Sequence, residues 1–274
     1  MPDPRGEEAM EPRHIEIAQD LMEEIDQGRY APGDSLPTED QLIQTYRTSR
    51  NTVRRALQEL SNRGRINTKQ GSGSTVRQYR PTVHLASPLQ GQSDDERYDN
   101  YLERMRREQG VAPREELMVG REAATGTLAH LLDLDPSEAR GFVVIRRCDR
   151  FVGPRLWERQ ESYYPDYIAE GTDLDRPANI PEGTKKLLAD LGYPQTGSWD
   201  VVGAKMPSLK ESSRFALGPG VPLLVHERVA YSNTTPIRFT RTYLPADRHQ
   251  LLYAEGAIAP ELLQMATDVN VYDR

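Results

Sequence analysis

The residues best suited to binding chemistry form a basic block between Arg47 and Arg80. The block has nine basic side chains and one acid, Glu59, so its net charge is +8, whereas the whole chain of 274 residues has a formal net charge of −7. Helix and hairpin patterns run through it, which a disordered basic tail would lack. A solvated charged face is the plain alternative, but a basic block in an acidic protein favours binding to a polyanion.

Within the block, one predicted helix combines a core-facing stripe with a polar face. Ser49 is a good cap for its amino end. The apolar stripe consists of Val53, Ala56, Leu57 and Leu60. At about 100° per residue, the side chains that point away from this stripe are Asn51, Arg55 and Gln58, with Arg54 on the flank and Arg50 at the amino end. The helix therefore presents a basic and amide-rich face to solvent.

That face has the chemistry of base recognition in a DNA major groove. Arginine binds O6 and N7 of guanine with two hydrogen bonds, and asparagine or glutamine binds adenine in the same way. The amino end of a recognition helix is the part that reaches base edges. Contacts to bases or the adjacent backbone are therefore predicted for Arg50, Asn51, Thr52 and Arg54. Contacts to phosphates are predicted for Arg55 and Gln58.

The surrounding elements are predicted to hold this helix in a winged helix-turn-helix domain. A first helix spans His14 to Gln27 and ends at Gly28, and a second begins at Thr38, with Gln41 as its capping-box partner. After the third helix, two strand-like runs follow at Ile66–Gln70 and Ser74–Gln78. They are joined by a glycine-rich tip and predict a hairpin.

The hairpin tip is a second candidate for DNA contact. Gly71 and Gly73 have no side chains, so the backbone could approach a minor groove closely there, and Lys69 adds positive charge. An ordinary tight turn is the alternative, but the position directly after a basic helix favours contact. Lys69 and Gly71 are therefore predicted to contact DNA. Thr38, at the start of the second helix, is also predicted to be a DNA-binding residue.

Many residues of this domain stand at fixed spacings. They are Gly28, Tyr30, Pro32, Gly33, Asp34, Leu36, Pro37, Thr38, Glu39, Leu42, Tyr46, Ser49, Arg50, Thr52, Val53, Arg54, Ala56, Leu57, Gly64, Ile66 and Gly71 to Ser74. This pattern resembles the DNA-binding domain of the GntR family of bacterial transcription regulators. The resemblance implies that Arg50, Thr52, Arg54 and Gly71 approach the operator. Asp40 departs from it, because members often carry Arg there; the acid removes one usual contact and places a repulsive charge near phosphate.

The rest of the chain predicts a linker and then an antiparallel α+β domain. Proline, serine, glycine and glutamine are frequent from Thr82 to Asp95, and a helix with Tyr98, Tyr101, Leu102 and Met105 is expected to end at Gly110. Strands are predicted at Leu117–Arg121, Gly141–Arg150, Leu156–Tyr164, Ser198–Lys205, Leu223–Tyr231 and Ile237–Leu244. Helices are predicted at Thr125–Leu132, Gly183–Leu191 and Ser208–Phe215. Strands that follow one another in pairs favour an antiparallel sheet.

Short motifs in this second region resemble the UTRA effector domain of the HutC subfamily. They lie at Leu131–Pro136, Val144–Arg147, Gly153–Pro154, Gly183–Tyr193, Gly220–Leu224 and Thr235–Ile237. The resemblance implies a chorismate-lyase-like fold, an antiparallel sheet with flanking helices, with a small-molecule effector bound against the sheet.

The resemblance also implies which residues bind the effector. Arg146 aligns with an arginine that helps to hold phosphate in phosphosugar-sensing members, since a guanidinium gives two parallel hydrogen bonds to an oxyanion. Cys148 stands where a second arginine is usual, which weakens the case for a phosphorylated effector and leaves the effector class open. The other candidates are Ser162, Tyr164, Arg238 and Thr240. The alternative for each is an ordinary residue of the sheet face, and Arg146 could instead form a surface ion pair.

Several classes of function are excluded or disfavoured. One cysteine, Cys148, excludes an internal disulfide and a cysteine-based zinc cage, and the five histidines (His14, His84, His130, His226 and His249) lack metal-ligand spacing. No Ser-His-Asp spacing or paired carboxylate motif supports catalysis, so no enzyme, cofactor or metal is predicted. The acidic amino terminus does not fit a signal peptide, and no apolar run is long enough for a membrane span, so a cytoplasmic location is predicted.

Together these observations predict a ligand-responsive transcription regulator. The predicted parts are a disordered tail (residues 1–12), the winged helix-turn-helix domain (13–80), a linker (81–97) and an effector-binding and dimerisation domain (98–274). We expect a homodimer that represses from a pseudopalindromic operator and is released by a small-molecule effector. The alternatives are a lyase-like enzyme and an architectural DNA-binding protein that responds to no ligand.

Overall fold

The computed structural model describes residues 11–69, 73–78, 81–85, 113–137 and 141–255, with isolated positions at 106, 110, 258, 259, 262, 265 and 269. These residues form two compact units. The first holds the described residues of Met1–Arg80 and Gly218–Val221, and the second those of Pro81–Leu217 and Pro222–Val269. Four predictions concern residues outside the described ranges: most of the disordered tail, the hairpin tip with Gly71, the linker after residue 85, and most of the helix before Gly110.

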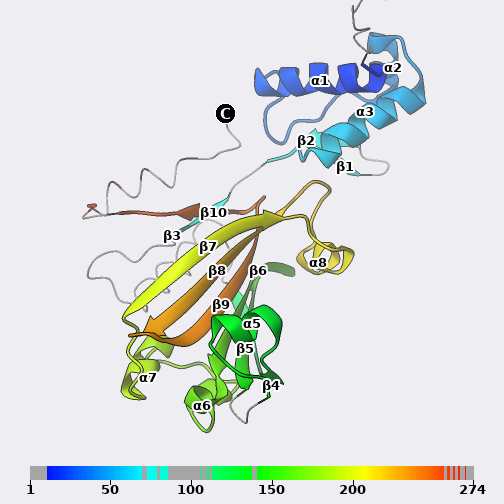
Figure 1. The fold of residues 1–274 in the computed structure, drawn as a ribbon. Helices are drawn as coiled ribbons and strands as arrows, with labels where there is room; N and C mark the ends of the chain where they lie inside the picture. The colour runs from blue at the N-terminus through cyan, green and yellow to red at the C-terminus, as the bar shows by residue number, and fades with distance from the viewer. Residues whose placement is uncertain are drawn as a thin grey trace, which may run out of the picture. The chain divides into compact units, whose positions relative to one another are not determined.

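The first unit has the predicted order of three helices and a hairpin (Figure 1). Its elements are α1 (Arg13–Asp26), α2 (Glu39–Tyr46), α3 (Arg50–Asn62), β1 (Ile66–Lys69) and β2 (Gly73–Val76). The two strands pair antiparallel, with Ile66 opposite Val76 and Lys69 opposite Gly73. The prediction of a winged helix-turn-helix is confirmed.

Local chemistry explains where these helices begin and end. Gly28 follows α1 with a φ of 77°, a left-handed conformation that glycine adopts without steric cost. At the start of α2, Thr38 and Gln41 form the predicted capping box. Arg47 ends α2 in a left-handed conformation, with a φ of 47°, and Ser49 caps α3. The turn between α2 and α3 is therefore short and well defined.

One apolar core holds the three helices and the hairpin together. The predicted stripe of α3 is buried, and it packs with residues of the other elements of this unit. These include Ile17, Leu21, Leu36, Leu42, Ile66 and Val76. Because burying each such side chain contributes roughly 1.5–3 kcal/mol, the core fixes which face of α3 is turned to solvent.

The second unit contains a six-stranded antiparallel sheet in the order β4-β5-β6-β9-β8-β7. Its strands are β4 (Arg114–Ala123), β5 (Phe142–Val152), β6 (Arg155–Pro165), β7 (Gly197–Lys205), β8 (Leu223–Ser232) and β9 (Thr235–Pro245). All six predicted strands are present. Each observed strand overlaps its predicted range and differs by a few residues at the ends.

Short helices cover the sheet, and alternation along the strands gives each face its own core. On β5, Val144 belongs to a cluster with Ile168 and Leu188, whereas its neighbour Val143 belongs to a cluster with Ala129. The first cluster involves α6 (Asp166–Ala169), the 3-10 helix η1 (Asp173–Asp175) and α7 (Thr184–Asp190). The second involves α5 (Gly126–Leu131), and a third, smaller cluster involves α8 (Leu209–Phe215). The predicted α+β class is confirmed.

One pair of strands differs from the prediction. β3 (Thr82–Leu85) pairs in parallel with β10 (His249–Leu252), with Thr82 opposite His249. The composition of this region predicted that the linker begins at Thr82, and no strand was predicted after Leu244. Four-residue strands are too short to show a periodic pattern, and these two are separated by more than 160 residues. No helix in the described ranges has the length and apolarity of a membrane span.

Candidate nucleic-acid interface and effector site

The amino end of α3 is built by a side-chain cap. The Ser49 hydroxyl accepts a hydrogen bond from the Thr52 backbone N–H at 3.2 Å and lies 2.8 Å from the Thr52 hydroxyl. From this start, the predicted contact residues at positions 50, 51, 54, 55 and 58 are all exposed, and Thr52 is half-buried. The structure thus brings the predicted recognition residues onto one exposed face of α3.

Two arginines of this face form ion pairs with acids of α2. Arg50 lies 2.5 Å from Asp40, and Arg54 lies 3.0 Å from Glu39. The guanidinium side chains are 56% and 61% exposed, so these pairs are weak and can exchange their carboxylate for a phosphate. Arg55 has no ion-pair partner among the residues that the structure describes. Asp40, the residue that departs from the family pattern, therefore neutralises a predicted base-reading arginine.

Of the remaining residues predicted to bind DNA, the structure describes the side-chain contacts of two. Gln58 donates to Asn62 at 2.8 Å on the exposed face of α3. Thr38 uses its hydroxyl in the capping box, where it accepts from the Gln41 N–H at 3.3 Å. The side chain of Lys69 and all of Gly71 lie outside the described residues.

The six predicted effector residues share one face of the six-stranded sheet. Arg146 on β5 is directly opposite Ser162 on β6, and Ser162 is opposite Thr240 on β9. The Ser162 and Thr240 hydroxyl oxygens are 3.3 Å apart. The other three lie two residues away along the same strands: Cys148, Tyr164 and Arg238. Since residues two apart on a strand point to the same side, these side chains form a common floor beneath η1 and α7.

Arg146 is a structural brace in this floor. It is 7% exposed, and its Nη1 donates to the backbone carbonyls of Asp173, Leu174 and Arg176 at 3.0, 2.9 and 2.7 Å. Its Nη2 donates to the carbonyl of Ala178 at 2.8 Å. Burial lowers the pKa of this guanidinium below its usual value. The side chain ties the η1 segment onto the sheet.

The other predicted effector residues are engaged in different ways. Burial raises the pKa of the Cys148 thiol to about 12, so the sulfur is a neutral thiol and a poor nucleophile. Tyr164 is 1% exposed and belongs to the core cluster beneath α7. Arg238 donates to the Thr184 hydroxyl and to the Gln195 side chain, both at 3.1 Å, and so connects β9 with α7 and the loop after it.

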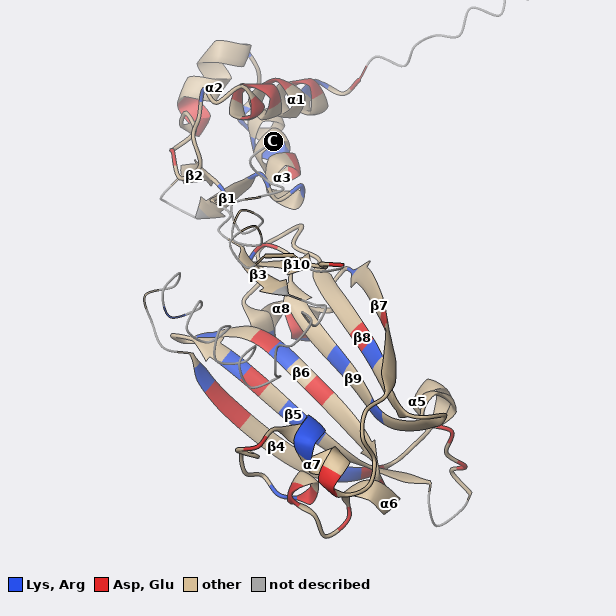
Figure 2. Cartoon of the chain, turned by 90° about the vertical axis from the view of Figure 1, so that its left-hand side faces the viewer, with Lys and Arg blue, Asp and Glu red and all other residues tan. Residues whose placement is uncertain are grey.

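The same face carries polar residues that the sequence analysis missed. Arg228 on β8 is opposite Thr240, and Asp200 on β7 is opposite Arg228, with 2.7 Å between Arg228 Nε and the carboxylate. Burial alone would raise the pKa of Asp200, but hydrogen bonds from Arg228 and His226 lower it below the usual value. The next row includes Gln160 opposite Cys148 and Thr242 opposite His226. Charged positions of both signs recur along these strands (Figure 2). Gln160 and Thr242 could have been found from the sequence, because each lies two residues along a strand from a predicted position, Ser162 or Thr240. Arg228 and Asp200 could be found only from the register of the strands.

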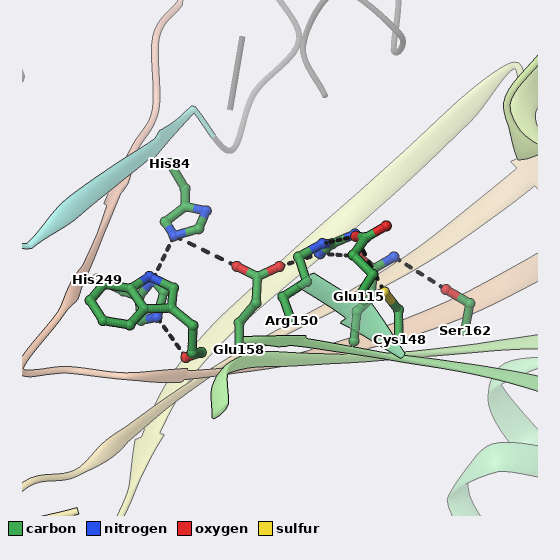
Figure 3. Close-up of polar contacts among 9 residues, drawn as sticks. His84, Glu115, Cys148, Arg150, Glu158, Ser162 and His249 are labelled. Atoms are coloured by element: carbon green, nitrogen blue, oxygen red, sulfur yellow. Dashed lines mark hydrogen bonds and ion pairs between the residues drawn. The ribbon is translucent and has the colours of Figure 1, made fainter. Parts of the chain in front are cut away.

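One group of residues has the composition of a metal site. Ligand atoms of His84, Glu158 and His249 all lie within 4.8 Å of one another, and Figure 3 shows them beside Arg150, Glu115 and Cys148. Burial, with a smaller effect of His84, holds the pKa of His249 well below its usual value, so this ring is neutral. No histidine pair has metal-ligand spacing along the chain, but pairing of β3 with β10 brings these two together.

Comparisons with known proteins are consistent with this geometry. A model described as bacterial regulatory proteins, gntR family, matches residues 14–76, and a UTRA domain model matches residues 108–250. The "Histidine utilization repressor" of Pseudomonas putida is 24% identical over 242 residues, which cover 88% of this chain and 90% of that protein. The "Probable transcriptional regulator PhnF" of Escherichia coli strain K12 is 34% identical over 218 residues, 77% of this chain and 81% of that protein.

A solved structure has the same fold. A crystal structure of a GntR-family transcriptional regulator superposes with a TM-score of 0.64 at 22% sequence identity. The superposition covers 90% of this chain and 98% of the other.

Proposed function

The chain belongs to the GntR family of bacterial regulatory proteins and carries a UTRA domain, and from this we propose that it represses transcription as a homodimer bound to a pseudopalindromic operator. A small-molecule effector would release it. Family membership makes the chain a ligand-responsive transcription regulator, and the predicted HutC-type architecture is confirmed. The relatives are regulators, so the lyase-like alternative is excluded. The relative named a histidine utilization repressor supports repression as the mode of action.

The observation that carries the proposal is the exposed basic face of α3. Its apolar stripe is buried in the core of the first unit, so the opposite face is available to a DNA groove. In this proposal the amino end contacts bases or the adjacent backbone through Arg50, Asn51, Thr52 and Arg54. Phosphates are contacted by Arg55 and Gln58, and the amino end of α2 and the wing contribute Thr38, Lys69 and Gly71.

The floor of the six-stranded sheet is proposed as the effector site. It offers hydroxyl, amide and charged groups on neighbouring strands, with Ser162, Thr240 and Gln160 close to one another. Such a floor suits a small polar molecule that both donates and accepts hydrogen bonds. Tyr164, Cys148, Arg146 and Arg238 would complete its walls. Effector and operator then weaken each other by the same factor, for which we expect a coupling free energy of about 1–3 kcal/mol.

The homodimer is proposed because a helix-turn-helix reads a short half-site and gains affinity from a second copy. β7 is an edge strand of the sheet, and every residue from Gly197 to Lys205 is exposed. Its apolar side chains include Trp199, Val201 and Val202, at 38%, 52% and 43% exposure. Exposed apolar edge strands invite pairing, and a second copy of this chain along β7 would cover them. Sedimentation of the purified chain should then give a dimer, and Val201→Asp should shift it towards monomer.

The domain limits given above (1–12, 13–80, 81–97 and 98–274) are proposed for the tail, DNA-binding domain, linker and effector-binding domain. A cytoplasmic location is proposed with them, because the operator is chromosomal.

Selection from a pool of random DNA duplexes tests the proposal. The full-length chain should enrich an inverted repeat whose half-sites are separated by about one helical turn. Enrichment of no sequence would contradict the α3 assignment. A single half-site without its repeat would contradict the operator-bound dimer.

A thermal-shift screen then separates a ligand-responsive repressor from an architectural DNA-binding protein. Sugars, sugar phosphates, amino-acid breakdown products and signalling lactones should include a compound that raises Tm and weakens binding to the selected operator. A compound that raises Tm without changing DNA affinity would show that the sheet floor binds ligands but is not coupled to DNA.

A further inference from the structure

Three residues from distant parts of the chain bring metal-type ligand atoms together in the second unit. His84 lies on β3, Glu158 on β6 and His249 on β10 (Figure 3). Nε2 of His84 is 2.6 Å from Nδ1 of His249 and 3.9 Å from Oε2 of Glu158. Glu158 and His249 are 3% and 1% exposed. A half-buried and a buried imidazole that face one buried carboxylate are a composition found in metal sites.

Hydrogen bonding orients the His249 ring for this role. Its Nε2 lies 2.9 Å from the backbone carbonyl oxygen of Trp157. A carbonyl only accepts, so Nε2 carries a hydrogen, and Nδ1 is the ring nitrogen that faces His84. Metal-ligating histidines are held in the same way, with the second ring nitrogen donating to a carbonyl or carboxylate.

The carboxylate has a comparable arrangement. Glu158 uses Oε1 in its ion pair with Arg150, while Oε2 is the oxygen that faces His84. Arg150 also pairs with Glu115. One oxygen of Glu158 is thus directed at the histidines and the other is held by a second partner, as is usual for a carboxylate that binds a metal.

We propose that His84, Glu158 and His249 form a binding site for a divalent transition metal ion, with Zn²⁺ as the best match. Zinc bonds of about 2.0–2.1 Å in a tetrahedron separate ligand atoms by roughly 3.3 Å. The observed 2.6 and 3.9 Å lie on either side of that separation, and the three ligand atoms all lie within 4.8 Å of one another, so side-chain movements of about 1–1.5 Å create the site. His84 would bind through Nε2 with its hydrogen on Nδ1. Three protein ligands leave a fourth position for water.

The ion would join a short sheet to the large one. In the part of the chain that the structure describes, the β3–β10 sheet has four residues in each strand, and two-stranded sheets are marginally stable by themselves. A metal ion bound to β3, β6 and β10 would attach this small sheet to the large one. This inference does not depend on the proposed function, since it concerns only residues of the second unit.

Zinc titration of the full-length chain tests the site. The protein, with any affinity tag removed, is stripped with EDTA, desalted and titrated with ZnCl₂ by calorimetry. We expect one ion per chain with a Kd below about 1 μM and, at a hundredfold excess over Kd, a rise in Tm of about 5 °C or more. Co²⁺ in place of Zn²⁺ should give the visible absorption of a four-coordinate ion.

Two ligand variants and a matched control decide the outcome. His84→Ala and Glu158→Gln should each weaken zinc binding by at least about 100-fold, since even partners of ligands contribute 10–100-fold. His226→Ala removes a histidine that also faces a carboxylate, at 2.8 Å from Asp200, and should leave zinc binding unchanged. If His84→Ala fails to fold, Glu158→Gln still tests the site, because it keeps the shape of the side chain. Absence of zinc binding by the wild-type chain, or equal binding by a folded ligand variant, overturns the proposal.

Discussion

The arginines of the recognition helix and of the sheet floor differ in exposure and in their partners. Arg54 on α3 is 61% exposed and has one carboxylate partner, Glu39, at 3.0 Å. Arg146 on β5 is 7% exposed and donates to four backbone carbonyls at 2.7–3.0 Å. The first guanidinium can change partner at little cost, because exposed ion pairs contribute about 0–1 kcal/mol. The second cannot leave without removing the donor of four backbone carbonyls.

This difference corresponds to two functions of arginine side chains in the molecule. An arginine that binds DNA needs to be accessible and weakly held in the free protein, as on α3. An arginine whose donors are used by its own backbone organises a site whose ligand contacts come from its neighbours. In the sheet floor those neighbours are hydroxyl and amide groups, such as Ser162, Thr240 and Gln160.

The sharpest test of this contrast is Arg146→Ala. Loss of the guanidinium removes the donor of four carbonyls in and after η1, and each hydrogen bond to a charged group contributes about 1.5–3 kcal/mol. We therefore expect the free energy of unfolding to fall by at least about 3 kcal/mol. Urea denaturation followed by tryptophan fluorescence measures it, because both tryptophans, Trp157 and Trp199, lie in the six-stranded sheet.

Arg176→Ala is the matched control for that experiment. Arg176 is 66% exposed and pairs with Asp173 at 2.8 Å, in the same segment that Arg146 braces. Its replacement should change the free energy of unfolding by less than about 1 kcal/mol. If Arg146→Ala were as stable as this control but failed to respond to effector, Arg146 would be a ligand group and not a brace.

On the DNA side, Arg54→Ala should have the next largest effect. A bidentate contact to guanine discriminates by about 1–3 kcal/mol, so operator affinity should fall by that amount and base preference should relax at one position. Arg55→Ala should instead weaken all sequences alike and reduce the slope of log K against log salt by about one. Fluorescence anisotropy at several salt concentrations distinguishes the two. Operator binding by Arg54→Ala equal to wild type would mean that α3 is turned differently in the groove.

The recognition helix was predictable because its information is local. The Ser49 cap, the buried stripe from Val53 to Leu60 and the capping box of α2 are all encoded within a few residues of one another. The strands of the second unit were also predictable, since each has its own apolar pattern. Their register was not, so the residues of the floor on β7 and β8, such as Asp200 and Arg228, were missed.

Two features of the second unit depend on contacts that no local pattern shows. The partners of Arg146 are backbone carbonyls 27 to 32 residues away, and backbone atoms leave no mark in the sequence. His84 and His249 meet although 165 residues separate them. Metal-ligand spacing along the chain therefore could not reveal the cluster with Glu158, and the short β3–β10 pairing that creates it was not predicted.

A smaller effect is expected from Asp40→Asn, in the opposite direction to the arginine variants. The substitution frees Arg50 from its 2.5 Å ion pair and removes a negative charge beside the recognition helix. Affinity for any DNA should rise by about two- to fivefold, with a steeper salt dependence. Asp20→Asn, at an exposed position of α1, makes the same change in net charge on another helix and controls for it. Equal effects of both variants would show that Asp40 acts through net charge alone.

The smallest expected effect concerns a half-buried carboxylate in the second unit, Glu211, whose partner Lys205 is exposed. Hydrogen bonding from Lys205, with the Ser208 capping box of α8, lowers the pKa of Glu211 from 4.5 to about 2. A lowered carboxyl pKa means that the ionised group stabilises the fold above pH 4.5 and loses this contribution as the pH falls through about 2. Because solvent reaches both side chains, which are 45% and 25% exposed, Glu211→Gln should cost about 0.5 kcal/mol at pH 7, and the difference from wild type should be more than halved at about pH 3. Urea denaturation at both pH values measures the free energy of unfolding. The difference between Lys205→Gln and wild type should depend on pH in the same way. A difference that stays constant between the two pH values would assign the stabilisation to the shape of the capping box and not to its charge.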